Sequence, residues 1–116
     1  MKLKPEDILQ IQICEWVKQL HPEIPIIGVM NQRKCSLVYG FILKKMGLRK
    51  GASDLMFPKG NGDKPGIWLE IKTFDGKASK EQVQFRDDMR ALGYEAHITY
   101  GFDEAIQVIS SFYGFG

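Results

Sequence analysis

Residues 67–73, which read IWLEIKT, decide the fold of this chain of 116 amino acids. The run is rich in β-branched, aromatic and other apolar side chains, so it predicts a strand. A turn-rich connector separates it from residues 53–57, which are also strand-like, and this arrangement predicts an antiparallel pair. After residues 67–73 the pattern predicts a helix over residues 79–92 and a further strand over residues 94–100. A strand, a crossover helix and a second strand place the two strands parallel, so the sheet is expected to be mixed.

The remaining segments extend this plan to both ends of the chain. Apolar side chains at three- and four-residue spacing predict a helix over residues 5–20. Residues 24–30 predict a short strand, and residues 36–46 and 103–112 predict two more helices. The expected order is α-β-α-β-β-α-β-α, an α/β fold whose mixed sheet is flanked by helices.

Length and composition are those of one globular domain over residues 1–116. Hydrophobic residues make up 44% of the chain and charged residues 26%, which excludes a disordered or low-complexity protein. No stretch approaches the roughly 18 apolar residues that a membrane helix needs. Cys14 and Cys35 have neither disulfide-scaffold nor zinc-site spacing. We therefore expect a reduced protein of the cytoplasm with no membrane partner.

Three charged residues near the expected hairpin suggest chemistry. Side chains alternate along a strand, so Glu70 and Lys72 should point to the same side. If the hairpin pairs as expected, Asp54 comes close to Glu70. Two carboxylates beside a lysine offer oxygen ligands of the kind that Mg²⁺ or Mn²⁺ prefers. The alternative is that Glu70 and Lys72 are ordinary solvent-facing residues and that Asp54 caps a turn.

A third carboxylate is available on the first predicted helix. Glu6 shares a stripe with Gln10, Ile13 and Val17 inside the apolar arc, whereas Glu15 lies on roughly the opposite side. Glu6 is therefore the candidate expected to face inward. The alternative is an acidic residue that the helix dipole favours in the first turn.

These residues form an ordered set of motifs that spans nearly the whole chain. The set is Glu6-x-x-x-Gln10, Asn31, Met46-Gly47-Leu48-x-x-Gly51-x-x-Asp54-Leu55, Glu70-x-Lys72, Gly76-x-x-Ser79-x-x-Gln82 and Leu92-Gly93-Tyr94. It resembles the VRR-NUC nucleases, a branch of the PD-(D/E)xK superfamily. The chain departs from the family at Ser53, where a proline often stands, and in the loop Gln32-Arg33-Lys34-Cys35.

The resemblance implies a restriction-endonuclease-like fold and assigns roles by position. The metal set that it implies is Glu6, Asp54, Glu70 and Ile71. Lys72 would orient or activate the attacking water. Gln82, and with it Gln10, would lie beside the site, although position three of a capping box explains Gln82 without any catalytic role.

The function that the resemblance implies is metal-dependent, structure-selective cleavage of DNA by a stand-alone enzyme. Such members resemble Holliday-junction resolvases, act as homodimers and belong to phage or bacterial replication and repair. Two alternatives remain open, a flap or nicking nuclease that acts as a monomer and a DNA-binding module that keeps the fold without cutting.

The net charge of +2 conceals an uneven distribution along the chain. Seven basic residues and one acid lie between Asn31 and Gly60, whereas acids including Glu81 and Asp88 gather in the later helices. This distribution predicts a basic surface that is segregated from the acidic one and flanks the site. The expected DNA-binding residues are Asn31, Arg33, Lys34, Arg49 and Lys50.

Overall fold

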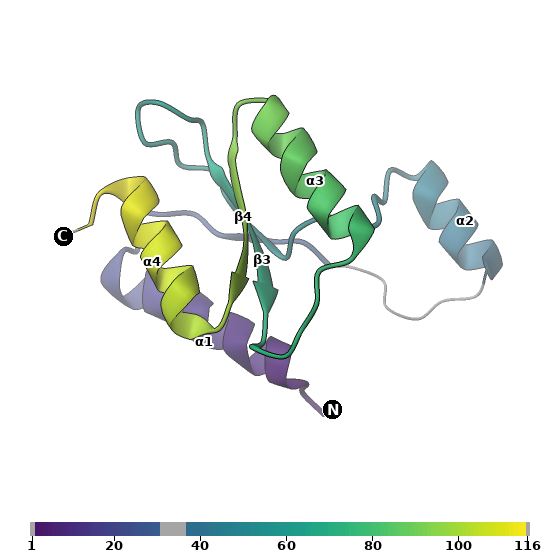
Figure 1. Ribbon diagram of the computed structural model, residues 1–116, viewed down its shortest axis with the longest axis horizontal. Coiled ribbons are helices and arrows are strands. Elements are labelled where there is room, and N and C mark those ends of the chain that lie inside the picture. The colour runs from purple at the N-terminus through teal and green to yellow at the C-terminus, as the bar shows by residue number, and fades with distance from the viewer. Residues whose placement is uncertain (1, 31–36, 116) are drawn as a thin grey trace.

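A computed structural model describes residues 2–30 and 37–115 and shows a four-stranded sheet with helices on both faces (Figure 1). The elements follow the expected order. The helices are α1 (Pro5–Leu20), α2 (Leu37–Lys45), α3 (Lys80–Ala91) and α4 (Phe102–Tyr113), and the strands are β1 (Ile27–Gly28), β2 (Leu55–Phe57), β3 (Ile67–Lys72) and β4 (Glu95–Tyr100). The α/β fold with a mixed sheet is confirmed.

The sheet has the strand order β1-β2-β3-β4. β2 pairs antiparallel with β3 through Leu55 opposite Leu69, and β3 pairs parallel with β4 through Glu70 opposite Ile98. Both pairings agree with the sequence prediction. The polar residues Glu70 and Lys72 therefore lie on an interior strand, beyond the point where β2 begins.

The hydrophobic core lies between the sheet and the pair α1 and α4. Ile13 and Val17 of α1 meet Leu69 of β3 and Ile109 of α4, and all four side chains are fully buried. α3 covers the opposite face, where Trp68 of β3 packs edge-on against Phe85 at 5.0 Å between ring centroids. Successive residues of β3 thus point to opposite layers, which places Glu70 and Lys72 away from the α1–α4 core.

The strand predicted over residues 24–30 is much shorter in the structure. β1 keeps only two residues, and the strand predicted from residue 53 begins at Leu55. A strand needs a partner for its backbone groups, and the one described partner of β1 is β2, which is itself three residues long. Ile24 is buried against the core without belonging to the sheet.

α2 stands apart from the rest of the molecule (Figure 1). None of the other described helices and strands packs against it. Leu37, Val38 and Phe41 are 94%, 71% and 61% exposed. The predicted start at Ser36 lies outside the described residues. Across residues 2–30 and 37–115, every helix is too short or too polar to cross a membrane.

Candidate functional site

Asp54 and Glu70 form a pair of carboxylates where β2 begins. Asp54 accepts a hydrogen bond at Oδ2 from the Ile71 N–H at 2.8 Å, and its own carbonyl accepts one from the Val29 N–H at 2.8 Å. These bonds fix Asp54 between the β1 and β3 sides of the sheet. Glu70, which is only 4% exposed, projects from β3 close to it. The convergence expected from the hairpin is confirmed.

Glu70 is a buried acid in an unfavourable environment for its charge. Its pKa is raised from 4.5 to about 8, first by burial and then by the neighbouring charge of Asp54 and a hydrogen bond with that carboxyl group, while Lys72 opposes the rise. When Glu70 is ionised, its Oε1 atom is buried without a hydrogen-bond partner among the described residues. A buried charge of this kind needs a proton or a cation beside it.

Lys72 supplies one positive charge to the same site. Its Nζ lies 3.6 Å from Glu70 Oε2, and its side chain is buried, with 8% of the residue exposed. The alternation along β3 therefore places the two side chains together, as the sequence predicted. The interpretation of Glu70 and Lys72 as ordinary solvent-facing residues is wrong, because neither is exposed.

Gln82 combines the two roles that the sequence left as alternatives. Its Oε1 accepts a hydrogen bond from the Ser79 N–H at 2.9 Å, which completes the capping box of α3. Its Nε2 donates to Glu70 Oε2 at 3.1 Å. One side chain thus caps the start of the helix and holds a carboxylate oxygen of the site, so the first turn of α3 is tied to β3.

Glu6 faces the site from the first turn of α1. Its negative charge is among the causes that raise the pKa of Glu70, whereas Glu15 is exposed. Glu6 is half-buried, as the helical phase predicted, although the exposed Glu15 also lines a groove beside Asp54. In the described part of the chain, however, no three acidic, histidine or cysteine side chains converge tightly enough to hold an ion. Asp54 affects Glu70 more strongly than Glu6 does, so Asp54 and Glu70 form the central pair of the site.

The main chain of Ile71 adjoins that pair, while its side chain is buried in the core. Its N–H reaches Asp54. In an extended strand the N–H and C=O of one residue point toward the same edge, so the Ile71 carbonyl faces the Asp54 side as well.

The donor atoms of this pair and of the Ile71 carbonyl are all oxygens, the ligand atoms that Mg²⁺ and Mn²⁺ prefer. A divalent cation would relieve the repulsion between Asp54 and Glu70, and it would give the buried Oε1 atom of Glu70 a partner.

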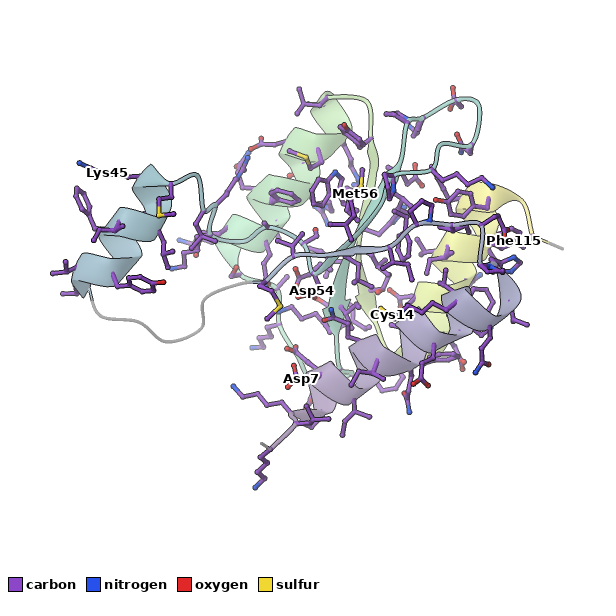
Figure 2. All side chains as sticks on the ribbon, turned by 180° about the vertical axis from the view of Figure 1, so that it is seen from behind. Asp7, Cys14, Lys45, Asp54, Met56 and Phe115 are labelled. Atoms are coloured by element: carbon purple, nitrogen blue, oxygen red, sulfur yellow. The ribbon has the colours of Figure 1, made fainter. Side chains whose placement is uncertain are left out.

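A groove with a volume of about 580 Å³ opens beside Asp54. Asp54 lines it together with Asp7, Gln10 and Cys14 of α1 and with Met30. Figure 2 shows Asp7 and Cys14 on α1 facing the region of Asp54. Gln10 thus borders the site, as expected from the resemblance. Asp7 was not among the predicted residues, and its position in the first helical turn beside Glu6 was the available signal.

The predicted basic surface is only partly present. Arg49 forms an ion pair with Asp88 and lies over the Phe85 ring at 5.1 Å, and Lys50 lies 3.5 Å from Glu81. The prediction that basic and acidic residues are segregated is therefore wrong at these two positions. They lie against acids of α3, 39 and 31 positions later in the chain. Asn31, Arg33 and Lys34 lie outside the described residues.

The sequence matches no family model and no curated protein. Among solved structures, one described as a "VRR_NUC domain protein" is similar to this chain, with a TM-score of 0.76 and 23% sequence identity. The similarity covers 100% of this chain and 93% of that one. The chain therefore has the fold of that VRR_NUC domain protein, which is the fold that the sequence resemblance implied.

Proposed function

We propose that this protein is a metal-dependent DNA endonuclease that hydrolyses phosphodiester bonds. The observation that carries the proposal is the buried Glu70 carboxyl group, whose pKa is raised to about 8 beside Asp54 and whose ionised form leaves Oε1 without a partner. Perturbed acids are concentrated at functional sites. The likeness to the VRR_NUC domain protein in fold supports a nuclease over other metal-dependent enzymes.

Each residue of the site has a distinct task in this proposal. Asp54 and Glu70 would hold Mg²⁺ or Mn²⁺, with Glu6 and the Ile71 carbonyl completing the set. A bound divalent ion lowers the pKa of a water ligand and offsets charge that develops on a phosphate. Lys72 Nζ, held beside Glu70 Oε2, donates a hydrogen bond to orient the attacking water. Gln82 keeps Glu70 in place by its bond to the same oxygen.

The test compares cleavage of a four-way junction, a 5′ flap, a 3′ flap and plain duplex DNA, each with Mg²⁺, with Mn²⁺ and with a chelator. We expect cleavage of branched DNA that requires the metal and exceeds cleavage of the duplex. Binding of the DNA without cleavage of any substrate would contradict the enzyme and favour a non-catalytic DNA-binding module. Calorimetry with Mn²⁺ then shows whether the carboxylates bind an ion at all.

The preferred substrate in this proposal is a Holliday junction, cut by a homodimer. A two-fold pair presents two sites symmetrically to a symmetric branched substrate. The apolar helix α2 supports self-association, because a nine-residue helix is too short to be stable alone in water and no other described element covers it. We infer that α2 packs against a second copy of the chain.

Phe41→Asp is expected to convert the dimer to a monomer, since it places a charge in the exposed apolar face of α2. Light scattering after size exclusion should give twice 13.2 kDa for the unaltered protein and 13.2 kDa for the variant. Phe41→Leu keeps the face apolar and serves as the control. A monomeric mass for the unaltered chain would instead favour a flap or nicking nuclease.

DNA contacts and location complete the proposal. Asn31, Arg33, Lys34, Arg49 and Lys50 are the proposed contacts with the phosphate backbone, and the ion pairs of Arg49 and Lys50 would exchange acids of α3 for phosphates. We further propose that residues 1–116 form one nuclease domain, that it works in the cytoplasm of a bacterial or phage-infected cell, and that it acts in replication or repair.

A further inference from the structure

The turn after β3 holds one large aromatic side chain in the solvent. Phe74 is 85% exposed, although it follows a strand whose other apolar side chains are largely buried. Hydrogen bonds fix this turn: the Gly76 N–H donates to the Thr73 carbonyl at 3.0 Å, and Thr73 Oγ1 donates to Asp75 Oδ1 at 2.7 Å. The backbone that carries Phe74 is therefore well defined.

The Phe74 ring lies against Gly101, the residue between β4 and α4. A Cβ atom built on Gly101 would lie 2.5 Å from Cζ of Phe74, so the ring occupies space that any other residue would fill. Gly101 has φ +87°, and its N–H donates to the Lys72 carbonyl at 2.9 Å. A scattered exposed apolar residue needs no explanation, but this ring occupies a position that is open only because residue 101 is a glycine.

The turn also borders the candidate site. Lys72 lies two residues before Phe74, and its side chain passes the turn, since a Cβ on Gly76 would lie 3.4 Å from Lys72 Cδ. Lys77 and Lys80 follow, both on exposed positions. An exposed aromatic side chain thus follows Lys72 of the candidate site by two residues, in a stretch with two further exposed lysines. Proteins combine aromatic and basic residues to bind nucleic acid bases and the adjoining phosphates.

We propose that Phe74 stacks on a nucleobase that lacks a stacking neighbour, next to the phosphodiester that the site cuts. This inference rests on the proposed nuclease function and names the feature of the substrate that the enzyme recognises. In continuous duplex DNA each base already has a neighbour on both faces. A free face occurs at a branch point, a flap or an unpaired base, so Phe74 selects DNA in which a base has such a free face.

The test measures binding with 2-aminopurine, a fluorescent base that reports stacking, placed at the branch point of a junction or inside a plain duplex. Asp54→Asn is the common background, so that the DNA is not cut. Phe74→Ala and Phe74→Leu are expected to weaken binding of the branched DNA by roughly 5- to 100-fold and to abolish the change in 2-aminopurine fluorescence. Phe74→Trp should restore both, and duplex binding should not change.

Leu92→Ala is the matched control, because Leu92 is also apolar and is 69% exposed. It is the C-cap of α3, at the opposite end of that helix from the turn that carries Phe74. Leu92→Ala should bind every DNA as the background does. Equal binding of branched DNA by Phe74→Ala, with cleavage by the unaltered enzyme intact, would overturn this inference and leave the nuclease function standing. Failure of the unaltered protein both to bind and to cut any DNA would overturn the function and this inference with it.

Discussion

Replacing Asp54 with asparagine is expected to abolish cleavage while making the metal-free protein more stable in alkaline buffer. Asparagine has the same shape, and its carbonyl oxygen can still accept the bond from the Ile71 N–H. It lacks the negative charge that would hold a divalent ion. We expect the rate of cleavage to fall by at least about 10³-fold, the scale of losing a group that stabilises developing charge.

The gain in stability follows from the pKa of Glu70. That pKa is raised from 4.5 to about 8, so between these pH values the folded protein keeps a proton that the unfolded chain has released. The free energy of unfolding therefore falls as the pH rises through this window, by at most about 1.4 kcal/mol per pH unit. Without the charge of Asp54, the pKa of Glu70 moves toward its ordinary value and the loss is smaller.

Three measurements check this pair of effects. Steady-state cleavage of a branched substrate gives the activity, and urea unfolding from pH 5 to pH 9 in the presence of a chelator gives the stability. Mn²⁺ should raise the melting temperature of the unaltered protein at high pH and leave that of Asp54→Asn unchanged. Asp63→Asn removes the same charge from an exposed turn and should change neither property. Full activity in Asp54→Asn would rule out Asp54 as a metal ligand.

The central strand and its neighbours were predictable because their signals are local. The alternation of β3 assigned Glu70 and Lys72 to one side, and the capping box placed Ser79 at the start of α3. Helical phase was enough to place Glu6 on a half-buried face of α1 and Glu15 on an exposed one. Each of these inferences depends on residues a few positions apart, where backbone geometry fixes which side chains share a face.

What could not be predicted depends on distant partners. The short length of β1 is set by β2, which lies about 27 positions further on. The ion pair of Arg49 with Asp88 joins residues 39 positions apart, and no local sequence pattern predicts it. The second bond of Gln82, to Glu70, is equally non-local, which is why the sequence presented capping and site support as alternatives. The sequence predicted the basic loop residues 49–51 and the acidic residues of α3 separately, but it did not predict the contact between them.

Gly51→Ala is expected to destabilise the protein more than any other glycine-to-alanine change in the same region. Gly51 has φ +90°, and an added Cβ would lie 2.5 Å from the Glu81 carbonyl oxygen in the first turn of α3. Left-handed backbone costs a side chain about 1–3 kcal/mol, and overpacking costs about 1–3 kcal/mol more. The obstacle is backbone rather than the end of a flexible side chain, so it cannot simply rotate away.

Two matched glycines separate these costs in urea unfolding. Gly47→Ala tests the backbone conformation alone, because Gly47 has φ +101° with nothing within 4 Å of the added atom. Gly28→Ala tests neither cost, since it has free space and no positive φ. We expect the losses in the free energy of unfolding to rank Gly51→Ala above Gly47→Ala above Gly28→Ala. Equal losses for Gly51→Ala and Gly47→Ala would mean that the contact with Glu81 is not tight.

Gly51→Ala should also reduce cleavage below the temperature at which it unfolds, and this distinguishes it from a purely structural lesion. To admit the Cβ atom, either the segment leading to Asp54 or the first turn of α3 must move. The segment before Asp54 carries one carboxylate of the proposed metal site. The first turn of α3 carries Gln82, which holds the other carboxylate, Glu70, by a hydrogen bond to its Oε2. Either movement separates Asp54 from Glu70, so metal affinity should fall together with activity. Gly47→Ala, which adds strain without displacing α3, should bind Mn²⁺ as the unaltered protein does.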